Sequence, residues 1–164
     1  MQPLKGFAPC LWFDSQAQEA AEFYCAIFPN SKITPPSHYG NEGQEIHGRK
    51  AGSVATVTFE LSGHKIIALN GGPMFKFNEA ISFQVTCDDQ AEVDHYWNGL
   101  IAGTGSESRC GWLKDKYGVS WQIVPNRMIE IMTGADRDAA NRATAAMMTM
   151  RKIDIAAIEE AAKG

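Results

Sequence analysis

The chain has 164 residues, with 15 lysines and arginines against 19 aspartates and glutamates, and 45% of its residues are hydrophobic. This length fits one compact domain that buries roughly 70% of the surface of its unfolded chain. The basic residues are scattered, which excludes a nucleic-acid footprint, and no apolar stretch reaches the length of a membrane span. Because the N-terminus also lacks a basic and apolar leader, the sequence predicts a soluble, cytoplasmic protein without nucleic-acid or membrane partners.

The first predicted elements are a strand and a helix. Residues Gly6 to Phe13 have the character of a strand. Ser15 and Gln18 then form a capping-box pattern, which predicts that a helix opens at Ser15 and continues to Pro29. Residues 31–52 contain two prolines and several glycines, and we expect one or two strands and a long hairpin loop there.

Alternating patterns dominate the middle of the chain. Residues 54–61 alternate apolar and polar side chains, which predicts a half-buried strand, and a turn leads into a second strand over 64–70. Residues 81–87 alternate in the same way. Asp89 and Glu92 then form a second capping pattern, which predicts the start of another helix.

The C-terminal part adds a hairpin and helices. Residues 109–114 and 119–124 predict the hairpin, and Met128 to Met132 predicts a short helix. A stripe of alanine and methionine follows at helical spacing between Ala139 and Met150, and a last helix is expected to start at Asp154. We expect the stripe to cover the sheet or a partner subunit.

Two segments of the chain share one plan. Leu11 to Phe28 and Gln84 to Ile101 each hold a β-like run, an acidic cap and a helix with an aromatic pair, and the two aromatic pairs are separated by 73 residues. Such a duplication predicts two similar modules that present equivalent positions to a shared cavity.

Three segments carry a resemblance to a known family. The segments are LWFDSQAQEAAEFYCAIFPNSKI, LNGGPMFKFNEAISFQV and CGWLKDKYGVSWQIVPNRM, and the last contains a DxxGVxW turn at Asp115 to Trp121. Together they resemble the PhnB-like family, often labelled demethylubiquinone methyltransferase, of the vicinal oxygen chelate group. That group also contains glyoxalase I, extradiol dioxygenases, and the bleomycin and fosfomycin resistance proteins.

The resemblance implies an α+β fold of two βαβββ modules, whose curved mixed sheets form a cleft, with C-terminal helices added. We expect module one over residues 1–73, module two over 79–126 and the C-terminal extension over 127–164, within a single domain covering 1–164. The family resemblance also implies a homodimer.

Metal-using relatives supply ligands, usually His and Glu, from the first and last strands of each module. The corresponding positions fall near 7–9, near 66–68, at Ser82 and at Gln122, and none of them is His, Asp, Glu or Cys. A divalent ion needs three or four strong donors, so we expect no metal and no cofactor. Each of the four histidines is interpreted as a solvated side chain. The alternative is that His38 or His47 folds over the cleft as a lid.

Strand alternation assigns residues to the cleft. Phe83 and Val85 are expected under the helix, so the residues between them face the other way. On the last strand, Trp121 and Ile123 are expected in the core, so Ser120 and Gln122 face the cleft. The 73-residue shift between the two copies then assigns Leu11 and Phe13 of module one to the cleft as well. The expected ligand-binding residues are Leu11, Phe13, Ser82, Gln84, Ser120 and Gln122.

The first hypothesis for function is a metal-free protein that binds a small, partly apolar molecule in this cleft, with no catalytic residue assigned. The second is a metal-dependent lyase, isomerase or dioxygenase whose ligands have been misplaced by a strand shift. The third is a dimeric scaffold with an occluded cleft. A true methyltransferase is not expected, because no glycine-rich turn between a strand and a helix is present.

Overall fold

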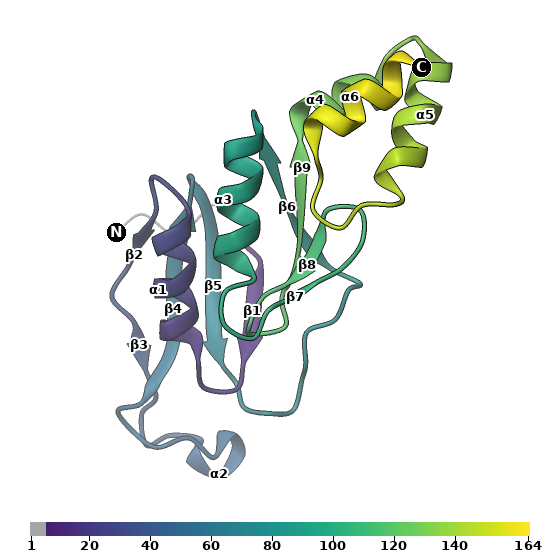
Figure 1. Cartoon of the computed structure of the whole chain (residues 1–164). Coiled ribbons are helices and arrows are strands. Elements are labelled where there is room, and N and C mark those ends of the chain that lie inside the picture. Colours follow the sequence, from purple (N-terminus) through teal and green to yellow (C-terminus); the bar gives the residue numbers. More distant parts are fainter. Residues whose placement is uncertain (1–5) are drawn as a thin grey trace. The chain divides into compact units, whose positions relative to one another are not determined.

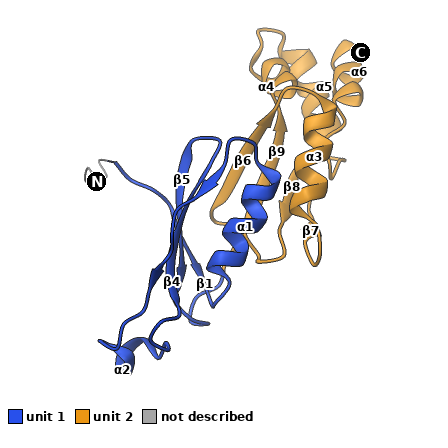
Figure 2. Cartoon of the chain, turned by 90° about the vertical axis from the view of Figure 1, so that its left-hand side faces the viewer, with its two compact units in different colours: residues 1–76 blue, residues 77–164 orange. Residues whose placement is uncertain are grey.

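Figure 1 shows the computed structural model of the chain, which describes residues 6–164. The chain divides into two compact units, Met1–Lys76 and Phe77–Gly164, which are coloured separately in Figure 2. Both the expected domain and module one begin at residue 1, and their first part, residues 1–5, lies outside the described residues. Within residues 6–164, no helix is both long enough and apolar enough to span a bilayer.

The first unit contains one mixed sheet. Its strands are β1 (Cys10–Phe13), β2 (Lys32–Ile33), β3 (Ser37–His38), β4 (Val54–Leu61) and β5 (His64–Asn70). The order is β1-β5-β4-β2, with β3 beside β4, and β1 runs parallel to β5 whereas the other pairs are antiparallel. A short helix, α2 (Gln44–His47), lies in the segment that the sequence assigned to a hairpin loop.

Helix α1 (Ala17–Ile27) covers one face of this sheet, and Tyr24 stacks on Phe59 of β4 with ring centroids 6.0 Å apart. The predicted capping box at Ser15 is wrong. The helix begins at Ala17, and the side chain of its N-cap residue makes no capping hydrogen bond. Instead, the backbone N–H of Ala17 donates to Asn70 Oδ1 of β5 at 2.8 Å, so a residue distant in sequence satisfies the first turn.

The second unit repeats this arrangement. Its strands are β6 (Ser82–Cys87), β7 (Ser106–Glu107), β8 (Trp112–Lys114) and β9 (Ser120–Pro125), and its covering helix is α3 (Gln90–Leu100). The order is β6-β9-β8-β7, with β6 parallel to β9. Asp89 caps α3 as predicted, because its Oδ1 accepts from the N–H of Glu92 at 2.9 Å.

The two sheets therefore have the same topology: in each, the first strand pairs in parallel with the last, and the last pairs with the strand before it. This confirms the α+β fold with two mixed sheets. The second unit has the order βαβββ, and the first departs from it because two short strands, β2 and β3, both pair with β4 and α2 is inserted before β4.

Three further helices follow β9: α4 (Asn126–Thr133), α5 (Arg137–Met147) and α6 (Ile155–Lys163). They enclose what we call the C-terminal core, formed by Val124, Met128, Ala143, Ile153 and Ile158. Part of the alanine and methionine stripe packs into this core, and Asp154 caps α6 where the sequence predicted its start.

Candidate functional site

One face of the second sheet carries two rows of mostly uncharged polar side chains. Residues that pair across neighbouring strands point to the same side of a sheet, so strand register defines each row. The first row, across β7, β8, β9 and β6, is Ser106, Lys114, Ser120 and Ser82. The second row, which begins just beyond β7, is Ser108, Trp112, Gln122 and Gln84.

We call this surface the open face, because the opposite face is covered by α3. On the covered face, Leu113 and Trp121 are buried, and the indole N–H of Trp97 in α3 donates to Glu107 Oε1 at 3.2 Å. On the open face, the amide of Gln122 donates to Ser82 Oγ at 2.8 Å. Gln84 is exposed.

Ser120 lies in the first row and is only 1% exposed. Within the described part of the chain, its hydroxyl is the buried side-chain polar atom that has no hydrogen-bond partner. Ser120 also lines a pocket of about 170 Å³, which we call the Ser120 pocket, together with Ser106, Ser108, Trp112, Lys114 and Glu79.

The single titratable residue in the two rows is Lys114, and its ammonium pairs with the carboxylate of Glu79, which precedes β6. The hydrogen bond from Lys114, together with one from its own backbone, holds the pKa of Glu79 below its usual value. Glu79 is therefore ionised at neutral pH, and the ion pair presents both a cation and an anion at the pocket wall.

The turn between β8 and β9 fixes the register of these rows. Asp115 is 3% exposed, and its Oδ1 accepts from the N–H groups of Tyr117 and Val119 at 2.9 and 3.0 Å. Its Oδ2 accepts from the indole N–H of Trp121 at 2.9 Å. The DxxGVxW motif is thus a structural turn that aligns Lys114 with Ser120.

Four of the six predicted ligand-binding residues lie on the open face: Ser82, Gln84, Ser120 and Gln122. Trp112, Lys114, Ser106 and Ser108 were missed. The signal for them is the alternation around residues 106–114, which becomes informative only when the pairing of β7, β8 and β9 is known.

The face predicted for Leu11 and Phe13 is wrong. They are 6% and 2% exposed, and they pair with Ala68 and Asn70, which lie on the face that α1 covers. The connection between β1 and α1 is one residue longer than that between β6 and α3, so the helices are related by 73 residues but the strands by 74. A shift of one residue reverses the face of a strand. Ligand contact by any of the six residues stays a prediction.

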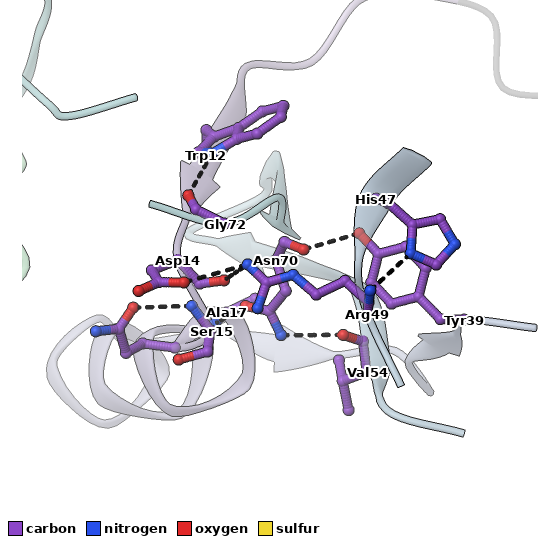
Figure 3. Close-up of polar contacts among 11 residues, drawn as sticks. Trp12, Asp14, Ser15, Ala17, Tyr39, His47, Arg49, Val54, Asn70 and Gly72 are labelled. Atoms are coloured by element: carbon purple, nitrogen blue, oxygen red, sulfur yellow. Dashed lines mark hydrogen bonds and ion pairs between the residues drawn. The ribbon is translucent and has the colours of Figure 1, made fainter. Parts of the chain in front are cut away.

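A second polar cluster lies in the first unit (Figure 3). The guanidinium of Arg49 pairs with Asp14 Oδ1 at 3.1 Å and donates to the Asp14 carbonyl at 2.7 Å. The hydroxyl of Tyr39 donates to the Asn70 carbonyl at 2.8 Å, and Trp12 Nε1 donates to the Gly72 carbonyl at 2.8 Å. Because these groups satisfy one another, we interpret the cluster as a structural anchor for residues 39–53.

Within this cluster, His47 packs its ring on Tyr39 at a centroid distance of 4.5 Å, and its Nδ1 accepts from the N–H of Arg49. With Nδ1 as the acceptor, Nε2 of the neutral ring donates to the Glu42 carbonyl at 3.2 Å. His47 is therefore packed within its own unit, and His38 is exposed on β3. The other two histidines, His64 and His95, are exposed.

The residues at the positions where the resemblance implied metal ligands do not fit a divalent ion. In the second unit those positions are the hydroxyl of Ser82 and the amide of Gln122, which are bonded to each other. In the first unit, the 74-residue shift between strands places Ala8 at the position of Ser82. The pairing of β1 with β5 places Ile67 at the position of Gln122. Neither side chain can coordinate a metal. Residues 6–164 contain no group of three or more His, Cys, Asp or Glu arranged to hold a metal.

Comparisons with known proteins agree with this architecture. The model of a family described as 3-demethylubiquinone-9 3-methyltransferase matches residues 5–124. The solved structure of a putative 3-demethylubiquinone-9 3-methyltransferase, PhnB protein, from Bacillus cereus is 32% identical; the match covers 74% of this chain and 99% of that chain, with a TM-score of 0.64. The chain belongs to this family. The expected PhnB-like resemblance is thereby confirmed, and the family match ends before α4 begins.

A more distant solved structure, with a TM-score above 0.5, shares the fold of this PhnB-like protein. Protein PA1353 from Pseudomonas aeruginosa is 17% identical over 74% of this chain and 98% of that chain, with a TM-score of 0.58. The fosfomycin resistance protein FosX from Listeria monocytogenes is 12% identical over 76% and 95%, with a TM-score of 0.49. No curated protein matches the chain.

The methyltransferase name of the PhnB-like family describes no mechanism here. The common adenosylmethionine site uses a glycine-rich turn between a strand and a helix of a parallel sheet. Both sheets of this protein are mixed, and the turns that enter α1 and α3, Asp14 to Gln16 and Asp88 to Asp89, contain no glycine.

Proposed function

We propose that this PhnB-like protein binds a small, partly apolar molecule on the open face of its second sheet, without a metal ion. The observation that carries the proposal is the composition of the two rows: hydroxyls, two amides and one indole, with a single paired cation. Binding sites for small molecules combine apolar contact area with a few placed polar groups. The half-buried indole of Trp112 supplies contact area, and Gln84 and Gln122 supply amides.

Binding without chemistry follows from the side chains in the rows. General acid or base catalysis near neutral pH needs a histidine or a suitably perturbed carboxylate within reach of the substrate. The rows contain neither, and the carboxylate beside them, that of Glu79, is paired with Lys114 and has a lowered pKa, which makes it a weaker base. Sequestration of the ligand is therefore the function that these residues support best.

A thermal-shift panel of small aromatic and quinone-like compounds tests the proposal. A ligand that binds the folded state raises the melting temperature, because at 100 times its Kd it adds about 2.7 kcal/mol of stability. We expect hits whose shift is lost in Gln84→Ala and Gln122→Ala and kept in Gln18→Ala, a matched change of an exposed glutamine on α1. Hits that persist in both open-face variants, or an empty panel, would contradict the proposal.

The same hits should be unaffected by EDTA and by added zinc, nickel or manganese. Stoichiometric metal in protein purified without chelators, together with binding that EDTA abolishes, would favour a metal-dependent activity instead.

We also propose a cytoplasmic location and a homodimer. The location is supported by the four free cysteines, Cys10, Cys25, Cys87 and Cys110, since reduced thiols are typical of a reducing compartment. Fractionation of cells tests the location, and light scattering coupled to gel filtration tests the dimer, with a mass of one chain as the contrary result.

A further inference from the structure

The Ser120 pocket is a small hollow at one end of the open face. The pocket occupies about 170 Å³ at the β7 and β8 end of the first row, below the 300 Å³ or so that usually encloses a whole ligand. It therefore suits one end of a molecule, with the volume of about six water molecules in the liquid.

The hydroxyl of Ser120 requires a partner. Buried polar groups in folded proteins are almost always hydrogen-bonded, and an unpaired one is costly. Ser120 is 1% exposed and has no partner among residues 6–164, although its neighbours Ser82 and Gln122 bond to each other. The oxygen has less than 1 Å² of accessible surface, so a ligand atom in the Ser120 pocket completes its hydrogen bond after the side chain rotates about its Cα–Cβ bond toward the pocket.

The charges around the pocket are compensated. Lys114 pairs with Glu79, and Glu107, which also lines the pocket, accepts from Trp97 and pairs with Arg151 at 3.3 Å. A charged ligand would have to compete with these ion pairs, whose side chains are partly exposed, whereas a neutral ligand leaves both ion pairs intact.

We propose that the Ser120 pocket binds a neutral group of the carboxamide class, as the polar end of the molecule held on the open face. The carbonyl oxygen of the amide accepts from Ser120 Oγ and the Lys114 ammonium, and its N–H donates to the Glu79 carboxylate. An amide matches this lining because it presents a strong acceptor and a separate donor. The apolar remainder of the ligand lies along Trp112. This inference rests on the proposed function, which it deepens.

The C-terminal segment holds the pocket wall in place. The N–H groups of Cys110 and Gly111, which lead into Trp112, donate to the carbonyls of Met150 and Arg151 at 2.9 and 2.8 Å. These bonds fix the loop between β7 and β8 against the residues that precede α6. A rigid wall lowers the entropy cost of binding a small group.

The experiment is an NMR titration of the uniformly ¹⁵N-labelled full chain with acetamide, acetate and methylammonium at matched ionic strength. We expect saturable shifts at the backbone amides of Ser106, Lys114 and Ser120, with a Kd for acetamide at least about five-fold below those of the two ions. Ser120→Ala should weaken acetamide binding about five-fold or more, the effect of one lost hydrogen bond. Ser15→Ala, an exposed serine of the first unit, should leave it unchanged.

Ser106→Ala provides a second variant whose exposed side chain is not required for folding. It should weaken acetamide binding without changing the dispersion of the spectrum. Equal or tighter binding of acetate or methylammonium, shifts that do not saturate, or an unchanged Kd in Ser120→Ala would each overturn the inference.

The two proposals fail in different ways. Loss of acetamide binding, while panel compounds still depend on Gln84 and Gln122, overturns the pocket assignment and leaves the proposed function standing. Acetamide binding with an empty panel overturns the proposed function alone.

Discussion

Replacing Ser120 by alanine should make the ligand-free protein more stable. A buried hydroxyl without a hydrogen bond costs about 1–3 kcal/mol relative to its solvated state in the unfolded chain. Ser120 is 1% exposed and its hydroxyl has no partner among the described residues, so alanine removes this cost and only one heavy atom of packing. We expect the free energy of unfolding to rise by about 1 kcal/mol, which is roughly five-fold in the folded to unfolded ratio.

Urea denaturation followed by tryptophan fluorescence measures this change. The signal reports on the second unit, which contains Ser120, because three of the four tryptophans, Trp97, Trp112 and Trp121, lie in that unit. The midpoint should rise with an unchanged m-value. A thermal melt should shift upward by about 2–4 °C for a chain of this size.

Ser82→Ala is the matched control with the opposite sign. Ser82 lies directly across from Ser120 in the register, but its hydroxyl accepts from Gln122 at 2.8 Å. Its removal should destabilise the protein by about 1 kcal/mol. If Ser120→Ala destabilised the protein as Ser82→Ala does, the Ser120 hydroxyl would have a partner in solution, such as a bound water, and the reasoning for the pocket would fail.

Three other substitutions test the second unit. Asp115→Ala removes the acceptor of three hydrogen bonds, including that of the Trp121 indole, and should lower the free energy of unfolding by roughly 3 kcal/mol or more in urea; a loss below about 1 kcal/mol would contradict the structural role of the turn. Gly111→Ala places a side chain at a φ of +81° with its Cβ 2.7 Å from the Ile123 carbonyl oxygen, and should cost about 2–4 kcal/mol, so a neutral result would exclude this backbone geometry. Burial, with smaller contributions from nearby carboxylates, raises the pKa of Cys87 from 9.0 to about 12, so this thiol should not react with Ellman's reagent at pH 8 in the native protein. Because its folded pKa lies above the unfolded one, Cys87 stabilises the protein fully below pH 9, and this contribution is lost between pH 9 and about 12; in Cys87→Ala that part of the decline should disappear.

The sequence predicted those elements whose signals are local. The strands Val54–Leu61 and His64–Asn70 have the predicted bounds, because the first alternates along its length and the tight turn at Ser62 and Gly63 fixes where the second begins. The starts of α3 and α6 were found from Asp89 and Asp154, whose carboxylates accept from N–H groups three residues further along. Such contacts need no knowledge of the rest of the fold.

The errors arise where a distant residue decides the local structure. The start of α1 depends on Asn70, whose bond to Ala17 spans 53 residues, and the capping pattern at Ser15 gave a false signal. The Ser120 pocket depends on the pairing of β7 with β8 and of β8 with β9, which brings Ser106, Lys114 and Ser120 into one row. Neither arrangement follows from periodicity, because periodicity defines faces within a strand and not the register between strands.

The duplication fixes the backbone of both units but leaves their open faces chemically different. Gln84 and Gln122 of the second unit correspond, through the same parallel register, to Cys10 and Ile67 of the first. The next pair in the first unit is Trp12 and Leu69. The same face of the first sheet also carries Thr56 and Thr58 of β4, which pair with Leu69 and Ile67, so the apolar cleft wall predicted for module one stays a prediction. The second sheet thus has amides at the two positions where the first has a thiol and an aliphatic side chain, so discrimination between ligands of the second sheet should depend on substitutions at Gln84 and Gln122.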